Sequence, residues 1–228
     1  MAIIDPTQKE IMNEQKAFLK GKSFKYKLDY FKQYYLVPTL LILGGILLVF
    51  FMIRSIVTAK DTAINVLYIN GINLPEEEEF ELYAGVDTKE YEVIYDNTIQ
   101  LHAEAQDTTN YTSIQKWIAV ISAKDGDVMI GDYVTMDAYA TSSFYMDLRE
   151  LFTEEEYAAL EDRMIWVNIY DDDNNPTGET APMFIDITDC KIMNEYYTYV
   201  GNQAVYSVAA NTQRPEICKT YLKYLLEE

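Results

Sequence analysis

The sequence predicts an α/β protein in which a single transmembrane helix is followed by one extracytoplasmic α/β sandwich domain. Three observations predict it: a long uncharged segment, opposite net charges on its two sides, and an alternation of strand-like and helix-like segments after it. We therefore expect a cytoplasmic basic arm at residues 1–32, a transmembrane helix at 33–56 and an extracytoplasmic domain at 61–228.

The predicted span is the most apolar part of the chain. Residues 33–53 contain no charged side chain, and a helix of this length measures about 31 Å, enough to cross the hydrocarbon core of a bilayer. Soluble core helices rarely run this long without a polar face. The alternative is a secretory signal cleaved after Val57-Thr58-Ala59, but the apolar run exceeds the roughly 7–15 residues of a signal core.

Charge predicts the orientation of the span. The chain has 37 acidic and 18 basic side chains, a net charge of −19, which excludes a general nucleic-acid binder. Residues 1–60 carry a net charge of +5 and the rest −24. The arm holds most of the lysines near the span, so the positive-inside rule places the amino terminus in the cytoplasm and the domain outside the cell membrane. These lysines are Lys16, Lys20, Lys22, Lys25, Lys27 and Lys32.

The same pattern gives the arm and the span one predicted partner, the lipids of the membrane. Residues 33–56 would contact acyl chains, and a polybasic stretch beside a span binds anionic headgroups. Asp5-Pro6 is typical of a helix start, so a short helix through Leu19 is expected. Gly21-Lys22-Ser23 is not a phosphate-binding loop, because the required glycine five positions earlier is Lys16.

Beyond the span, segments of period two alternate with segments of helical period. The expected capping box at Thr153 and Glu156 begins one helix, and an amphipathic helix closes the chain. The predicted strands are 64–70, 91–95, 128–130, 164–170, 183–187 and 204–209; the predicted helices are 112–123, a second from Asp132 through Ala140, 153–161 and 214–226. Strands interleaved with helices predict layers around one central sheet.

Three stretches resemble bacterial extracellular solute-binding proteins of the type 2 periplasmic-binding class. They are IAVISAKDGDVMIGDYVTMDAYATSSFYMDLREL at 118–151, APMFIDITDCKIM at 181–193 and VAANTQRPEICKTYLKYLLE at 208–227. The resemblance implies the fold of one lobe of such a protein and a role in binding a solute. Members of that class close two lobes on their solute and are commonly held by a lipid, whereas here one lobe follows an apolar helix.

The candidate binding residues are Asp132 and Tyr133. They follow a predicted strand and open a helix, at the edge where α/β sheets place ligand contacts. Asp is also a favoured helix N-cap, so a purely structural role for Asp132 is the alternative. The sixteen tyrosines after residue 60 are typical both of binding surfaces and of half-buried strand faces.

Other candidate residues favour simpler interpretations. His102 is the only histidine, and no nucleophile motif accompanies it. The run from Asp171 to Glu179 is rich in oxygen ligands, but Pro176 stands where a calcium loop needs glycine, so a solvated turn is expected. Cys190 and Cys218 either form a disulfide or are each buried and unbridged. We expect no catalytic residue, metal or cofactor.

Two function classes follow from these observations. The first is a membrane-anchored solute-binding-like or transporter-accessory module without enzymatic activity. The second is a structural interaction module that has lost its ligand site and docks another extracytoplasmic protein through its acidic, tyrosine-rich surface. An enzyme with an unrecognised hydrolase site is the third and weakest, because no hydrolase elbow or metal motif is present.

The predicted orientation is testable by cysteine labelling in intact cells. A membrane-impermeant thiol reagent should label a cysteine placed at Asp172 and leave one placed at Lys20 unlabelled until the membrane is opened. The wild-type chain supplies the background from its own two cysteines. Labelling of the Lys20 position with protection of the Asp172 position would reverse the predicted topology.

Overall fold

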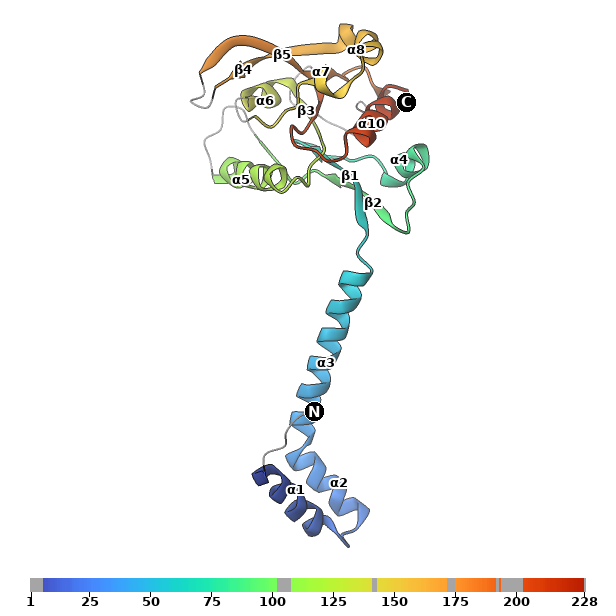
Figure 1. Ribbon diagram of the computed structural model, residues 1–228, viewed down its shortest axis with the longest axis vertical. Coiled ribbons are helices and arrows are strands. Elements are labelled where there is room, and N and C mark those ends of the chain that lie inside the picture. The colour runs from blue at the N-terminus through green and yellow to red at the C-terminus, as the bar shows by residue number, and fades with distance from the viewer. Residues whose placement is uncertain are drawn as a thin grey trace. The chain divides into compact units, whose positions relative to one another are not determined.

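The computed structural model describes residues 6–101, 108–140, 143–171, 175–191, 193 and 203–227. The chain divides into two compact units, Met1–Ala59 and Lys60–Glu228, and each is treated by itself (Figure 1). The first contains three helices: α1 (Pro6–Leu19), α2 (Phe24–Tyr34) and α3 (Leu36–Val57).

The helices of the first unit begin and end where local chemistry requires it. Helix α1 starts at Pro6, as the sequence predicted, and Gly21 turns the chain with a left-handed φ of 83°. Ser23 then caps α2 by accepting a hydrogen bond from the Tyr26 amide at 3.3 Å. Gly21-Lys22-Ser23 is therefore a turn followed by a helix cap.

Proline explains why the apolar helix starts later than residue 33. Pro38 has no amide proton for the carbonyl of Tyr34, and its ring crowds that carbonyl. The helical path is broken at Tyr35, where φ is −116°, so α2 ends at Tyr34 and α3 begins at Leu36. Within α3, the segment Leu36–Ser55 is long and apolar enough to cross a membrane.

The second unit is a mixed α/β domain, which confirms the predicted class. Its elements, in chain order, are β1 (Asp61–Tyr68), α4 (Glu77–Ala84), β2 (Tyr91–Asp96), α5 (Thr108–Ser122), β3 (Val128–Asp132), α6 (Tyr133–Ala138), α7 (Leu148–Leu151), α8 (Glu154–Leu160), the 3₁₀ turn η2 (Glu161–Arg163), β4 (Met164–Tyr170), β5 (Pro176–Asp186), β6 (Ala204–Val208) and α10 (Pro215–Glu227).

The six strands form one mixed sheet in the order β2-β1-β3-β6-β5-β4. Strands β2, β1 and β3 are parallel, and each crossover between them carries a helix, α4 or α5. Strand β6 runs antiparallel to β3, with Val128 opposite Val208, and β5 and β4 continue the sheet antiparallel. The carboxyl ends of β1 and β3 therefore meet at one edge.

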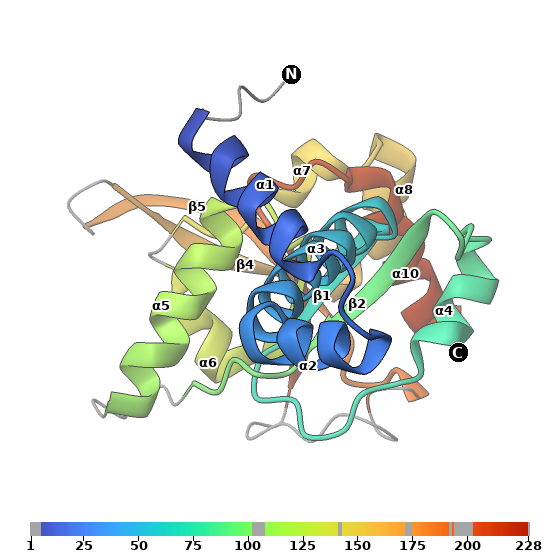
Figure 2. The ribbon, with the colours of Figure 1, turned by 90° about the horizontal axis from the view of Figure 1, so that it is seen from below.

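Two hydrophobic layers cover the two faces of this sheet, as Figure 2 shows by the separation of α5 and α6 from α4 and α10. Side chains alternate along β1: Val66 and Tyr68 pack in the layer of α4 and α10, and Leu67 packs in the layer of α5 and α6. In the first layer the hydroxyls of Tyr68 and Tyr221 form a hydrogen bond, and Tyr206 donates to the Cys218 carbonyl at 2.8 Å. These hydroxyls attach α10 to the sheet.

The structure extends or shifts several predicted elements. Strand β5 begins at Pro176 rather than at the predicted Met183. Its first half pairs only with the edge strand β4 and is exposed, so it has no hydrophobic pattern from which a strand could be predicted. The capping box at Thr153 and Glu156 is present. Glu77 opens helix α4 within the acidic run 76–79.

We expect residues 60–228 to fold without the first unit, because both hydrophobic layers are built from their own residues. The purified fragment should unfold in one cooperative transition followed by the fluorescence of Trp117 and Trp166. Added salt should raise its melting temperature, since the net charge of −24 beyond residue 60 repels itself. A fragment that orders only in detergent would contradict this expectation.

Candidate functional site

The carboxyl edge of β1 and β3 contains the predicted residue Asp132, and the structure gives its carboxylate two hydrogen bonds. One oxygen accepts from the Thr135 amide at 2.9 Å, which caps α6. The other accepts from the Asn70 side-chain amide at 3.3 Å. Asp132 is only 1% exposed. Capping of α6 is therefore shown, and both carboxylate oxygens already have donors within the protein.

Asn70, which sequence reasoning did not single out, is the centre of this buried network. It follows β1 with a left-handed φ of 62°, a conformation that asparagine tolerates better than most residues. Its side-chain oxygen Oδ1 accepts a hydrogen bond from the Leu101 backbone amide at 2.6 Å. The following Gly71 is required because a Cβ there would lie 2.8 Å from the Cβ of Tyr68. The Asn-Gly pair at the end of the predicted strand 64–70 was the available signal.

Tyr133 lies beside Asp132 but is only partly buried. Its ring packs edge to face against Phe184, with 6.3 Å between the ring centroids. Burial, together with the charge of Asp137, raises the pKa of the Tyr133 hydroxyl, so the phenol is neutral at physiological pH. Contact of Asp132 and Tyr133 with a ligand stays a prediction, and for Asp132 it would require the buried carboxylate to become accessible.

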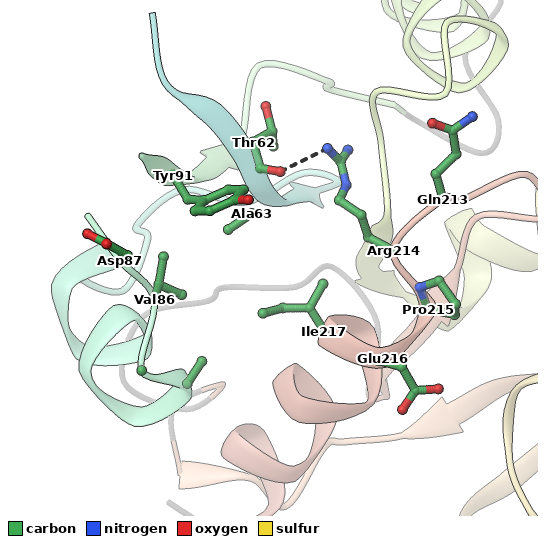
Figure 3. A pocket seen from close by; sticks show the side chains of 12 residues that line it. Thr62, Ala63, Val86, Asp87, Tyr91, Gln213, Arg214, Pro215, Glu216 and Ile217 are labelled. Carbon is green, nitrogen blue, oxygen red and sulfur yellow. Dashed lines mark hydrogen bonds between the residues drawn. The ribbon is translucent and has the colours of Figure 1, made fainter. Parts of the chain in front are cut away.

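A second buried carboxylate, Asp127, lies at the opposite end of β3. It is fully buried and accepts from the Asn65 amide at 2.9 Å, from the Thr212 hydroxyl at 2.6 Å and from Nε of Arg214 at 2.9 Å. Arg214 also donates to the Thr62 carbonyl at 3.1 Å, as the dashed line in Figure 3 marks. These bonds hold the start of α10 against β1 and β3.

Beside this ion pair lies a groove of about 510 Å³, which we call the α4–α10 groove. It is formed by the amino-terminal ends of β1 and β2, the carboxyl end of α4 and the start of α10 (Figure 3). Its lining includes Ala63, Ala84, Val86 and Ile217, together with the carboxylates Asp87 and Glu216. Arg214 also lines it, but its guanidinium is engaged by Asp127. Sequence reasoning missed this groove because its parts come from three distant segments.

The other residues that the sequence singled out are two cysteines, His102 and the run from Asp171 to Glu179. Cys190 and Cys218 are buried and unbridged, and burial raises the pKa of their thiols to about 11 and about 12. His102 and residues 172–174 lie outside the described residues. Asp171 accepts from the Asn175 amide at 2.8 Å between β4 and β5. Among the described residues no group of three His, Cys, Asp or Glu side chains is arranged to hold a metal.

The comparisons with known proteins do not add to this geometry. No protein-family model, curated protein or solved structure matches the chain. The resemblance to extracellular solute-binding proteins therefore stays a prediction, and the site is argued from its own residues.

The network around Asp132 predicts that even its closest isostere destabilises the domain. In Asp132→Asn the cap to Thr135 is kept, but a side-chain NH₂ faces the NH₂ of Asn70, so the free energy of unfolding should fall by about 1–3 kcal/mol. The reciprocal double variant Asn70→Asp/Asp132→Asn restores a donor opposite an acceptor and should recover most of this loss. Urea unfolding followed by tryptophan fluorescence measures both variants.

The single variant Asn70→Asp is the matched control, because two carboxylates would then face each other in a buried site. It should be the least stable of the three. If Asp132→Asn melts like the wild type, the hydrogen bond to Asn70 contributes nothing. A double variant that is stable but loses a ligand would instead show that the charge of Asp132 at this edge serves binding.

Proposed function

We propose that this chain is a membrane-anchored, non-enzymatic interaction module whose extracytoplasmic domain binds a segment of another extracytoplasmic protein. The observation that carries the proposal is the α4–α10 groove, an open, largely apolar surface with carboxylates among its lining residues. Helix α3 supplies the anchor, and the lysine excess before it supports a cytoplasmic amino terminus.

The lining defines the chemistry of the bound segment. Partly buried Ala63, Ala84, Val86 and Ile217 pack on the tyrosine-rich hydrophobic layer and offer an apolar floor. Asp87 contributes negative charge, Glu216 lies 3.5 Å from the ammonium group of Lys219, and the only arginine of the lining is engaged by Asp127. The groove therefore fits a segment with apolar side chains and at least one lysine or arginine. The strongly acidic composition beyond residue 60 favours the same partner over long range.

The groove supports a protein segment better than an enclosed small solute. Small-molecule sites bury most of the surface of the ligand, whereas this groove is open along one side. The predicted solute contact at Asp132 lies at the opposite ends of the strands, where the carboxylate is buried and hydrogen bonded. A transporter subunit is the partner that the resemblance to solute-binding proteins favours, and the module would then be accessory to transport.

Photo-crosslinking in the membranes of the native cells tests the proposal. Benzoylphenylalanine in place of Tyr91, which lines the groove and is 41% exposed, should form an adduct with one partner protein on illumination. The same residue in place of Leu82, which is 84% exposed on α4 but does not line the groove, is the positional control and should give little of that adduct.

A pair of charge-matched variants shows whether the groove itself binds. Ile217→Arg places a cation in the groove and should reduce the adduct at least tenfold, because it fills the apolar floor and repels a basic segment. Val134→Arg makes the same change in charge at an exposed residue of α6, on the other face of the sheet, and should leave the adduct unchanged. Equal adducts from Ile217→Arg and wild type, at equal melting temperature, would contradict the proposal.

A further inference from the structure

Helix α2 has an apolar stripe that the rest of the described chain leaves partly exposed, although the ring of Phe31 stacks on that of Tyr35. Phe24, Leu28 and Phe31 follow one another at spacings of four and three residues, so at about 100° per residue they lie within about 60° of one another on the helix. Their exposed fractions are 81%, 41% and 42%. Three large apolar side chains on one helical face are therefore left to solvent or to another phase.

The opposite face of α2 already has a partner. The rings of Tyr26 and Tyr30 lie with centroids 6.3 and 6.0 Å from the ring of Phe18 on α1. The Tyr35 hydroxyl, just after α2, forms a hydrogen bond to Gln15 on α1. These contacts join α1 and α2 into a hairpin and turn the Phe24–Leu28–Phe31 stripe away from it.

Lysines border the stripe on both sides. On the same angular scale Lys27 lies about 40° beyond one edge of the stripe and Lys32 about 40° beyond the other, with Lys25 close to Lys32. The only acidic residue of the helix, Asp29, lies about 130° from the centre of the stripe, on the far half. An apolar stripe flanked by lysines on both sides is the pattern of a helix that lies in the interface of an anionic membrane.

The short connection between α2 and α3 indicates which surface the stripe can contact. Only Tyr35 separates the end of α2 from Leu36, the first residue of the segment that is apolar enough to cross a membrane. Once α3 is in a bilayer, α2 starts at the surface of that bilayer. A second copy of α2 is a poor alternative partner, because pairing the two stripes would bring the flanking lysines of both copies together and their like charges would repel.

We propose that α2 lies in the membrane interface on the side of the amino-terminal arm, with its stripe at the acyl boundary and its lysines at anionic lipid headgroups. This inference rests on the anchoring of the chain through α3 that the proposed function includes. Long lysine side chains suit the position, because their alkyl stems follow the stripe while the ammonium groups reach the headgroups. The kink at Tyr35 then marks the turn from the interface into the bilayer.

Spin labels on the full chain in lipid nanodiscs test the depth of each face. The chain is reconstituted at one copy per disc, in phosphatidylcholine alone or with added phosphatidylglycerol, and labelled at a single introduced cysteine. A label at Leu28→Cys should be accessible to oxygen and shielded from a nickel chelate. A label at Asp29→Cys, one position away on the far face, should show the reverse.

Two further variants test separately the contribution of the α2 lysines and the position of α3 in the bilayer. Replacing Lys25, Lys27 and Lys32 by glutamine should make the Leu28 label severalfold more accessible to the chelate in discs that contain phosphatidylglycerol. A label at Leu47→Cys in the middle of α3 reports the anchor itself and should stay accessible to oxygen in every sample.

The outcomes distinguish the two proposals. If the Leu28 label reaches the chelate as readily as the Asp29 label while the Leu47 label stays in the bilayer, the interfacial position of α2 is wrong and the anchor stands. If the Leu47 label also reaches the chelate, the anchoring in the proposed function fails as well. A Leu28 label shielded from both reagents would indicate a protein contact, which also overturns the inference.

Discussion

The ion pair between Asp127 and Arg214 is the constraint on which the arrangement of the second unit depends. A fully buried carboxylate is costly unless donors surround it, and here a backbone amide of β1, a hydroxyl and a guanidinium supply them. The donors come from residues 65, 212 and 214, so satisfying one carboxylate brings the start of the sheet and the start of the last helix together. Loss of one partner of such a pair typically costs about 3–5 kcal/mol.

That constraint also shapes the α4–α10 groove. Arg214 reaches from the start of α10 to the Thr62 carbonyl, so α10 is held beside the amino-terminal ends of β1 and β2. The aromatic layer of Phe80, Tyr221 and Tyr224 attaches α4 to α10, with ring centroids 4.7 and 5.5 Å from Phe80. The ion pair, this aromatic layer and the strand ends together leave an apolar channel between the two helices. The arginine that builds the groove is thereby engaged within the protein, whereas the carboxylates of Asp87 and Glu216 are part of the lining.

The two units differ in how far they expose their apolar side chains. In the first, apolar side chains of α3 and the stripe of α2 are exposed, and the tyrosine contacts between α1 and α2 are few. In the second, large apolar side chains fill two layers around a sheet, and the surface is rich in carboxylates. A chain that exposes its apolar side chains in one part and buries them in another is consistent with a protein that lies partly in lipid and partly in water.

The sequence by itself determined those features that depend on neighbouring residues. The uncharged run, the capping box at Thr153, the cap at Asp132 and strand β4 were all predicted, because each follows from local periodicity or from one side chain and nearby amides. The break at Tyr35 also depends on neighbouring residues, because Pro38 accounts for it, although the sequence predicted an unbroken helix from residue 33.

Tertiary structure decided the strand order, the partners of buried polar groups and the place of the groove. Nothing local to Asp127 says that its donors lie at residues 65, 212 and 214, and nothing near Asp132 says that Asn70 occupies its second oxygen. The first half of β5 has no strand pattern, because its pairing with β4 rather than burial holds it extended. Long-range pairing has no periodic signal in the chain, so the α4–α10 groove could be recognised only in the folded structure, where three distant segments meet.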